Sequence, residues 1–280
     1  MPLLFVFLWS TGFVAAKLGL PHIEPMTFLS VRFALVVALM LPLSLIWRAP
    51  WPAEPRQIVH IAVSGILLHG GYLGGVFASI HAGMSAGLCA LIVGVQPILT
   101  AFAAAPLLGE RVTARQWSGL LLGLGGAGLV LGDKITLEGL SAFSVAMALL
   151  ALVSISIGTL YQKRFCGRFD LRSGSVIQFV AAGFALLPFA LAFETRRIDW
   201  SVDLMLAMAW LVIVLSIVAI SLLTMIIRRG AATKVASLFY LVPPATAVEA
   251  YFLFHETLTG TAVLGMVIAI IGVALVTARA

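Results

Sequence analysis

Long runs of apolar residues alternate with short polar connections along the whole chain. A helix needs about 20 mostly apolar residues to cross the hydrocarbon core of a bilayer. Ten runs of about this length can be marked, with edges defined to two to four residues: 2–18, 27–47, 57–80, 84–107, 114–132, 139–162, 172–193, 203–227, 232–254 and 258–277. The runs are continuous rather than alternating, so they predict membrane-spanning helices and not the strands of a barrel.

The composition agrees with a chain embedded in lipid. Of the 280 residues, 62% are hydrophobic and 10% are charged. A soluble domain carries about 25% charged residues, so we do not expect a soluble enzyme, a nucleic-acid-binding module or a disordered chain. Neither Cys89 nor Cys166 has metal-ligand spacing to other residues, and we expect two unpaired thiols. The first run lacks the charged start and the cleavage site of a signal peptide, so we interpret it as a permanent helix.

The chain is internally duplicated. A shift of 146 residues aligns the two halves without a gap, and 11 of the 36 positions in 97–132 are identical to their counterparts in 243–278. The same shift pairs Ser10 with Ser156, Gly12 with Gly158, Lys17 with Lys163, Phe33 with Phe179, and Glu110 with Glu256. We therefore predict two five-helix repeats, residues 1–134 and 135–280.

An odd number of helices per repeat places the second repeat upside down relative to the first. On the predicted topology, 12 of the 17 Lys and Arg residues lie on the side shared by both termini, four lie on the other side, and Arg32 lies within a span. Because basic residues gather in cytoplasmic loops, we expect an all-α, multi-pass protein of the inner membrane with both termini cytoplasmic.

Inverted repeats are a recurrent architecture of secondary transporters, whose central site lies where helices are broken near the membrane midplane. Helix breakers occur at matching depth here. Pro97 lies in the fourth run and Pro243 in the ninth, while Gly12 and Gly158 lie in the first and sixth runs beside Ser10 and Ser156. These residues either line a central cavity or serve as ordinary kinks and close-packing positions.

The same segments resemble the drug/metabolite transporter superfamily, EamA-type branch. The resemblance rests on Trp9-Ser10-Thr11-Gly12-Phe13, Val95-Gln96-Pro97, Leu108-Gly109-Glu110-Arg111-Val112-Thr113, Leu241-Val242-Pro243 and Phe254-His255-Glu256-Thr257-Leu258-Thr259. It covers the whole chain and implies a ten-helix secondary transporter that exports small metabolites, commonly amino acids, through a cavity between the halves. The family also includes exporters of aromatic amino acids.

Glu249 is the most conspicuous candidate site residue, because a carboxylate inside a membrane span is expensive. It could carry protons or anchor a substrate ammonium group. The alternative is a solvated carboxylate close to the outer end of its span.

Other candidates have competing structural interpretations. His69 and Tyr72, three residues apart, are expected on one helix face, where they bind substrate or hydrogen-bond neighbouring helices. Gln96 and Tyr240 place polar groups at the broken segments, and Trp9 could stack on a planar side chain or anchor the helix at the interface.

The charged residues near span ends have simpler interpretations. We expect Arg32 to extend towards the interface rather than bind a substrate carboxylate. Lys17 and Lys163 are expected to bond helix carbonyls or form gate contacts, and Glu110 and Glu256 to cap helices or form turns.

The chain has no Walker-type phosphate loop and no metal-ligand cluster, so we predict no ATP hydrolysis and no cofactor. The favoured function is a secondary transporter that works by alternating access and exports amino acids, aromatic or hydrophobic ones above others. Its partners would be this amino-acid-like substrate, the lipid bilayer and, if transport is coupled, protons. The alternatives are an exporter of other drugs or metabolites, and a membrane-embedded enzyme or non-transport subunit.

Overall fold

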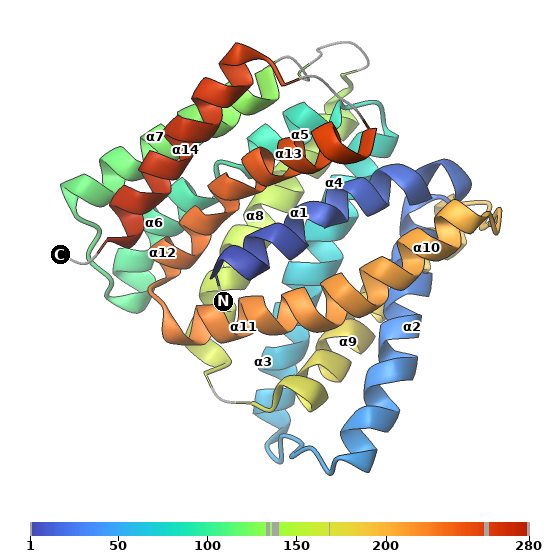
Figure 1. Cartoon of the computed structure of the whole chain (residues 1–280). Coiled ribbons are helices and arrows are strands. Elements are labelled where there is room, and N and C mark those ends of the chain that lie inside the picture. The colour runs from blue at the N-terminus through green and yellow to red at the C-terminus, as the bar shows by residue number, and fades with distance from the viewer. Residues whose placement is uncertain (1, 133–134, 136–139, 168, 255–257, 279–280) are drawn as a thin grey trace.

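The computed structural model describes residues 2–132, 135, 140–167, 169–254 and 258–278. Within these ranges the chain is a bundle of helices (Figure 1). The predicted spans that consist of one long helix, in one case with a short extension, are α1 (Pro2–Gly19) with η1 (Leu20–His22), α2 (Pro25–Ile46), α7 (Ala114–Leu131), α8 (Ala142–Phe165), α9 (Leu171–Phe193) and α14 (Gly260–Thr277).

The remaining expected spans are composite. The third is α3 (Pro55–Gly65), η2 (Ile66–Gly71) and α4 (Tyr72–His81), and the fourth is α5 (Ala86–Val93) and α6 (Gln96–Leu108). The eighth is α10 (Val202–Trp210), η4 (Leu211–Ala219) and α11 (Ile220–Arg229), and the ninth is α12 (Ala232–Ser237), η5 (Leu238–Leu241) and α13 (Val242–Phe254). The helical assignment of all ten runs is confirmed.

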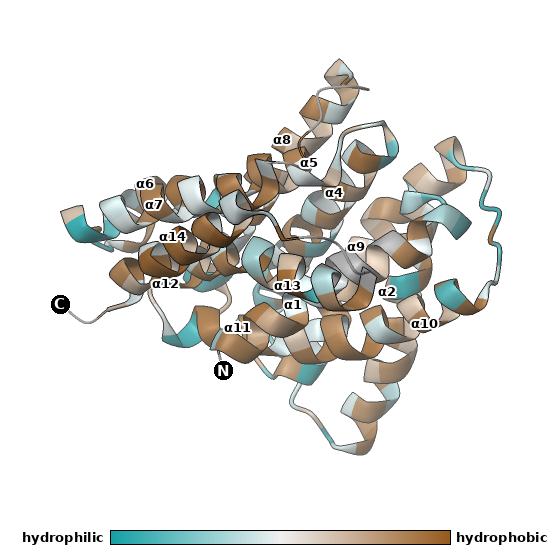
Figure 2. Cartoon of the chain, turned by 45° about the horizontal axis from the view of Figure 1, so that its top comes forward, coloured by the Kyte–Doolittle hydropathy of each residue, from teal (hydrophilic) through white to brown (hydrophobic). Residues whose placement is uncertain are grey.

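Most of these helices suit a bilayer. Eight stretches are long and apolar enough to cross one: Pro25–Ile46, Pro55–His81, Ala86–Leu108, Ala142–Phe165, Leu171–Phe193, Val202–Arg229, Ala232–Leu253 and Gly260–Thr277. Pro2–Gly12 is a shorter apolar helix, and α7, with Arg115 and Gln116 in its first turn, packs along α14. Hydrophobic colour dominates the helix bodies, and hydrophilic colour gathers at helix ends and in the loop before α10 (Figure 2). The count of ten crossings stays a prediction.

Equivalent helices of the two halves pack against each other in antiparallel pairs. Along α7 and α14, Gly119 lies against Gly272 while Gly126 lies against Gly265, so the two helices run in opposite directions (Figure 1). The absence of side chains at these positions lets the two backbones approach closely. Helices α2 and α9 form the second pair, and Phe33 meets its own counterpart Phe179 with ring centroids 5.4 Å apart.

Two π-helical segments also occupy equivalent positions. Segments η2 and η4 overlap when the two halves of the sequence are aligned. A Cβ atom at Gly12 would come within 2.4 Å of Leu215 in η4, and one at Gly158 within 2.9 Å of Leu68 in η2. Gly12 and Gly158 therefore lie in close packing contacts between α1 and η4 and between α8 and η2.

At one end of the bundle, the α1–α2 and α9–α10 connections are tied together. The Glu24 carboxylate accepts hydrogen bonds from the Thr195 hydroxyl at 2.7 Å and from the Arg196 N–H at 2.9 Å. The Thr195 bond is the main reason why the pKa of Glu24 lies below its ordinary value. Glu194 accepts from the N–H groups of Met26 and Thr27, and so satisfies the free donors at the start of α2.

Candidate functional site

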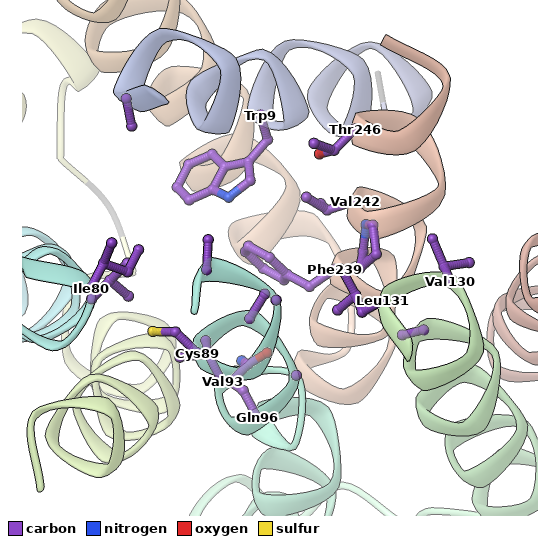
Figure 3. A pocket seen from close by; sticks show the side chains of 18 of the residues that line it. Trp9, Ile80, Cys89, Val93, Gln96, Val130, Leu131, Phe239, Val242 and Thr246 are labelled. Carbon is purple, nitrogen blue, oxygen red and sulfur yellow. The ribbon is translucent and has the colours of Figure 1, made fainter. Parts of the chain in front are cut away.

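A cavity of about 710 Å³ lies among helices contributed by both halves of the chain. It is bordered by α1, α4, the α5–α6 break, α7, α8 and the η5–α13 segment (Figure 3). Its lining comprises Trp9, Ala16, Leu20, Pro21, Tyr72, Val76, Ile80, Ala86, Gly87, Cys89, Ala90, Val93, Gly94, Gln96, Ala127, Val130, Leu131, Ile155, Phe239, Tyr240, Val242, Pro243, Thr246 and Ala247. The cavity has the size of a small-molecule site.

The lining is apolar and uncharged. Among the described lining residues there is no Asp, Glu, Lys, Arg or His, and the polar side chains are those of Tyr72, Cys89, Gln96, Tyr240 and Thr246. Phe239 meets Trp9 edge to face, with ring centroids 5.6 Å apart (Figure 3). Such a cavity favours a ligand with an apolar or aromatic body and a small polar head.

Two helix breaks border the cavity at equivalent positions. The first is the turn at Gly94–Val95 between α5 and α6, and the second is the 3₁₀ segment η5 before α13. Pro97 lies in the first turn of α6, where its missing N–H costs little. Pro243 follows the second break, and Gly94 and Tyr240, which are counterparts in the alignment of the two halves, both line the cavity.

Five predicted site residues line the cavity, namely Trp9, Tyr72, Gln96, Tyr240 and Pro243. The other six lie outside its lining. Pro97 and Ser156 are buried in their helices, where the Ser156 hydroxyl donates to the Leu152 carbonyl at 2.7 Å. Ile155, the counterpart of Trp9, also lines the cavity, so this pair of equivalent positions borders the same space in spite of its different chemistry.

Glu249 lies between α13 and α1. Its side chain is buried, with 9% of the residue exposed, and its Oε1 accepts a 2.5 Å hydrogen bond from the Ser10 hydroxyl. Its Oε2 has no hydrogen-bond partner among the described residues. The interpretation of Glu249 as a solvated carboxylate is therefore wrong, because α1 covers it.

His69 and Tyr72 have different neighbours. The His69 ring stacks on Phe179, with centroids 4.4 Å apart and planes 11° apart, whereas Tyr72 faces the cavity. The π-helical segment η2 ends between them at Gly71 and changes the angle between successive side chains. Of this pair, Tyr72 lines the cavity and His69 does not.

Arg32 does not extend to the interface. It is 4% exposed, and its Nε donates to the Ser216 hydroxyl in η4 at 3.0 Å. The prediction that it snorkels is wrong, because α2 packs between α9 and η4 and turns this face of the helix inward.

The cavity lining extends towards one end of the bundle. Among the lining residues, Leu20 directly follows α1, Ile80 lies in the last turn of α4 and Leu131 ends α7. At the opposite end, Lys163 of α8 contacts Glu110 of the α6–α7 loop at 2.8 Å and donates to the Gly230 carbonyl. Glu110 also accepts from the Ala232 N–H at 2.9 Å.

This second set of contacts, which we term the Lys163–Glu110 latch, joins α8, the α6–α7 loop and the α11–α12 junction. It agrees with the predicted bond from Lys163 to a helix carbonyl and with the predicted capping role of Glu110. The side chain of Lys17 and residue Glu256, which are the counterparts in the other repeat, lie outside the described residues.

Sequence reasoning did not find the apolar residues that line most of the cavity, such as Phe239, Val93 and Ile155. In a chain that is 62% hydrophobic, an apolar side chain gives no signal that distinguishes a cavity from lipid. Thr246 could have been found from the sequence, because it is a polar residue three positions after Pro243. In the structure its hydroxyl donates to the Ser10 carbonyl at 3.5 Å.

Comparisons with known proteins agree with this architecture. The family described as "EamA-like transporter family" matches residues 1–132 and again residues 142–278. The chain is 25% identical to a "Probable amino-acid metabolite efflux pump" of Escherichia coli (97% of this chain and 92% of that protein). It is 26% identical to an "Uncharacterized transporter YvbV" of Bacillus subtilis (98% and 89%). It is 24% identical to an "Uncharacterized inner membrane transporter YedA" of Escherichia coli (96% and 87%).

A solved structure titled "Crystal structure of protein" superposes with a TM-score of 0.82 at 20% identity and covers 99% of this chain and 95% of its own. At that identity the likeness concerns the fold alone.

Proposed function

Because the chain belongs to the EamA-like transporter family and is a multi-pass membrane transporter rather than an enzyme, we propose that it exports amino-acid-like metabolites by alternating access. The observation that supports this most directly is the cavity of about 710 Å³ between the two halves, whose lining extends to Leu20, Ile80 and Leu131 at one end of the bundle, whereas the Lys163–Glu110 latch lies towards the other end. We infer that this conformation is open at the first end and closed at the second, because alternating access requires each conformation to open the site to one side only.

The two repeats, 1–134 and 135–280, would be inverted copies. The antiparallel packing of α7 on α14, which are equivalent helices, supports this assignment. So does the recurrence of π-helical segments and helix breaks at equivalent positions of the two halves. In such a pair, exchanging the conformations of the two halves converts a state open on one side into a state open on the other.

The orientation follows from the basic residues. With most Lys and Arg side chains on the side of the termini, that side would face the cytoplasm of the inner membrane. The cavity described here would then be open to the outside, and the latch would be closed towards the cytoplasm.

The substrate would be an aromatic or hydrophobic amino acid. Trp9, Phe239 and Tyr72 offer apolar and aromatic contacts to such a side chain. The name of the similar Escherichia coli efflux pump supports the amino-acid class. Protons would be the coupling ion, carried by the buried Glu249.

Flux in proteoliposomes tests the proposal. Purified protein reconstituted with labelled L-phenylalanine is expected to exchange it with external unlabelled L-phenylalanine, and an imposed pH gradient is expected to drive net accumulation. The matched control is empty liposomes with the same gradient. Absence of flux for all aromatic and aliphatic amino acids would remove this substrate class.

A further inference from the structure

Two polar side chains that line the cavity are buried without satisfying all their hydrogen-bonding atoms. Gln96 and Tyr240 are each 1% exposed. The Gln96 Oε1 and the Tyr240 hydroxyl have no partner among the described residues, although both residues border the cavity. Leaving a buried polar atom unpaired costs free energy that folding must offset, so this arrangement needs a reason.

Other contacts hold both side chains in place. The Gln96 amide already bonds the Thr100 hydroxyl through its Nε2 at 3.2 Å. Whichever way the amide is placed, one polar atom bonds Thr100 and the other is left over. The Tyr240 ring is held against α7, where a Cβ atom at Gly123 would come within 2.4 Å of it.

The two residues lie where the backbone is also irregular. Gln96 is the first residue of α6, directly after the Gly94–Val95 turn, and its amide extends from that helix towards the space below Trp9 and Phe239 (Figure 3). Tyr240 lies in η5, just before α13 begins. Polar groups next to two helix breaks provide hydrogen-bonding atoms in an otherwise apolar cavity.

We propose that Gln96 and Tyr240 form the head-group subsite of this cavity and determine its specificity. The inference rests on the proposed transport function, and names the substrate more narrowly. The ligand has an aromatic or branched apolar body, no net charge, and a head that donates a hydrogen bond to Gln96 and bonds the Tyr240 hydroxyl. A net charge is disfavoured because the described lining offers no counter-charge.

Substitution separates this role from a structural one. Tyr240→Phe removes a hydroxyl that is unsatisfied in the free protein, so thermal unfolding of this variant without ligand should be unchanged or occur at a higher temperature. Gln96→Met removes the unsatisfied oxygen together with the hydrogen bond to Thr100, so its unfolding temperature should be unchanged or slightly lower. The affinity for L-phenylalanine, measured by calorimetric titration of the full chain in detergent, should fall about three- to tenfold, which is the value of one hydrogen bond. Opposite effects on stability and on binding are the signature of a ligand-binding group.

Tyr161→Phe is the matched control. The Tyr161 hydroxyl is satisfied by His60 at 2.7 Å, outside the cavity lining. Its removal should lower the thermal stability and leave the affinity for L-phenylalanine unchanged.

A ligand panel completes the test. L-Phenylalanine and the neutral 2-phenylethanol should bind, and the anionic 3-phenylpropionate and the cationic 2-phenylethylamine should bind at least tenfold more weakly. The proposal is overturned if both variants bind L-phenylalanine with the affinity of the parent protein. It is also overturned if 3-phenylpropionate and 2-phenylethylamine bind as tightly as L-phenylalanine, or if neither L-phenylalanine nor 2-phenylethanol binds. If 2-phenylethanol binds but no amino acid is transported, the subsite stands and the amino-acid function fails.

Discussion

At the scale of single residues, Glu249 decides whether transport is coupled to protons. Glu249→Gln keeps an oxygen that accepts from the Ser10 hydroxyl and removes the proton that the side chain could carry. We expect exchange of L-phenylalanine between the two sides of a proteoliposome to remain within about twofold of the parent, since exchange at zero gradient needs no net charge movement. Accumulation driven by a pH gradient should be lost.

The control for this substitution is Ser10→Ala, which keeps the carboxyl group and removes its donor. Gradient-driven accumulation should persist in this variant with an altered dependence on pH. Undiminished accumulation in Glu249→Gln liposomes would exclude Glu249 as the proton carrier.

The same scale shows why some residues could not be interpreted from the sequence. Gln96 and Tyr240 were found because helix breakers next to them mark irregular backbone in an apolar run. The prediction for Arg32 was wrong and the stacking of His69 on Phe179 was not predicted, because the direction of a side chain on a buried helix depends on the partner helix. Ser216 and Phe179, which receive Arg32 and His69, belong to the other half of the chain, so no local pattern points to them.

At the scale of helices, the α7–α14 pair depends on the absence of side chains along its contact. A Cβ atom at Gly126 would lie 2.4 Å from the Ala269 backbone nitrogen and 2.6 Å from the Gly265 carbonyl oxygen, so Gly126→Ala must push the helices apart. We expect a loss of about 1–3 kcal/mol, as for other overpacked interiors, seen as a lower unfolding temperature in detergent.

The neighbouring residue offers a matched control. At Gly125 a Cβ atom would meet nothing within 4 Å. Gly125→Ala should therefore leave the unfolding temperature unchanged or raise it, because alanine favours a helix over glycine. Equal effects of the two substitutions would contradict the close-packing account of this pair.

The helices also show how far the sequence determines the fold. Apolar run lengths predicted the described helices other than η1 (Leu20–His22), and proline and glycine positions predicted the breaks before α6 and α13. The π-helical segments η2 and η4 were not predicted, because a π-turn differs from an α-turn by one residue of hydrogen-bond register. Their residues, Ile66–Gly71 and Leu211–Ala219, have the ordinary apolar composition of a membrane helix.

At the scale of the whole molecule, the cavity and the Lys163–Glu110 latch lie towards opposite ends of the bundle. Leu131 lines the cavity, whereas Ala104, Leu160 and Ala232 form a small buried cluster next to the latch. Both charged side chains of the latch are largely buried (21% and 18% exposed). A rigid-body exchange between the halves has to separate these contacts before the closed end can open.

Breaking the latch should therefore change which end is accessible. In a chain with Cys89→Ser and Cys166→Ser, a soluble maleimide is expected to label Leu131→Cys rapidly and Ala104→Cys, which is fully buried, slowly. Adding Glu110→Gln weakens the contact with Lys163 by about 1 kcal/mol. That should raise the population of the opposite state, and the rate at which Ala104→Cys is labelled, about fivefold.

Glu24→Gln, which alters a carboxylate at the other end of the bundle, should leave the labelling of Ala104→Cys unchanged. If both substitutions accelerate it equally, Glu110 only stabilises the fold, and the separation of the two ends into alternating gates fails.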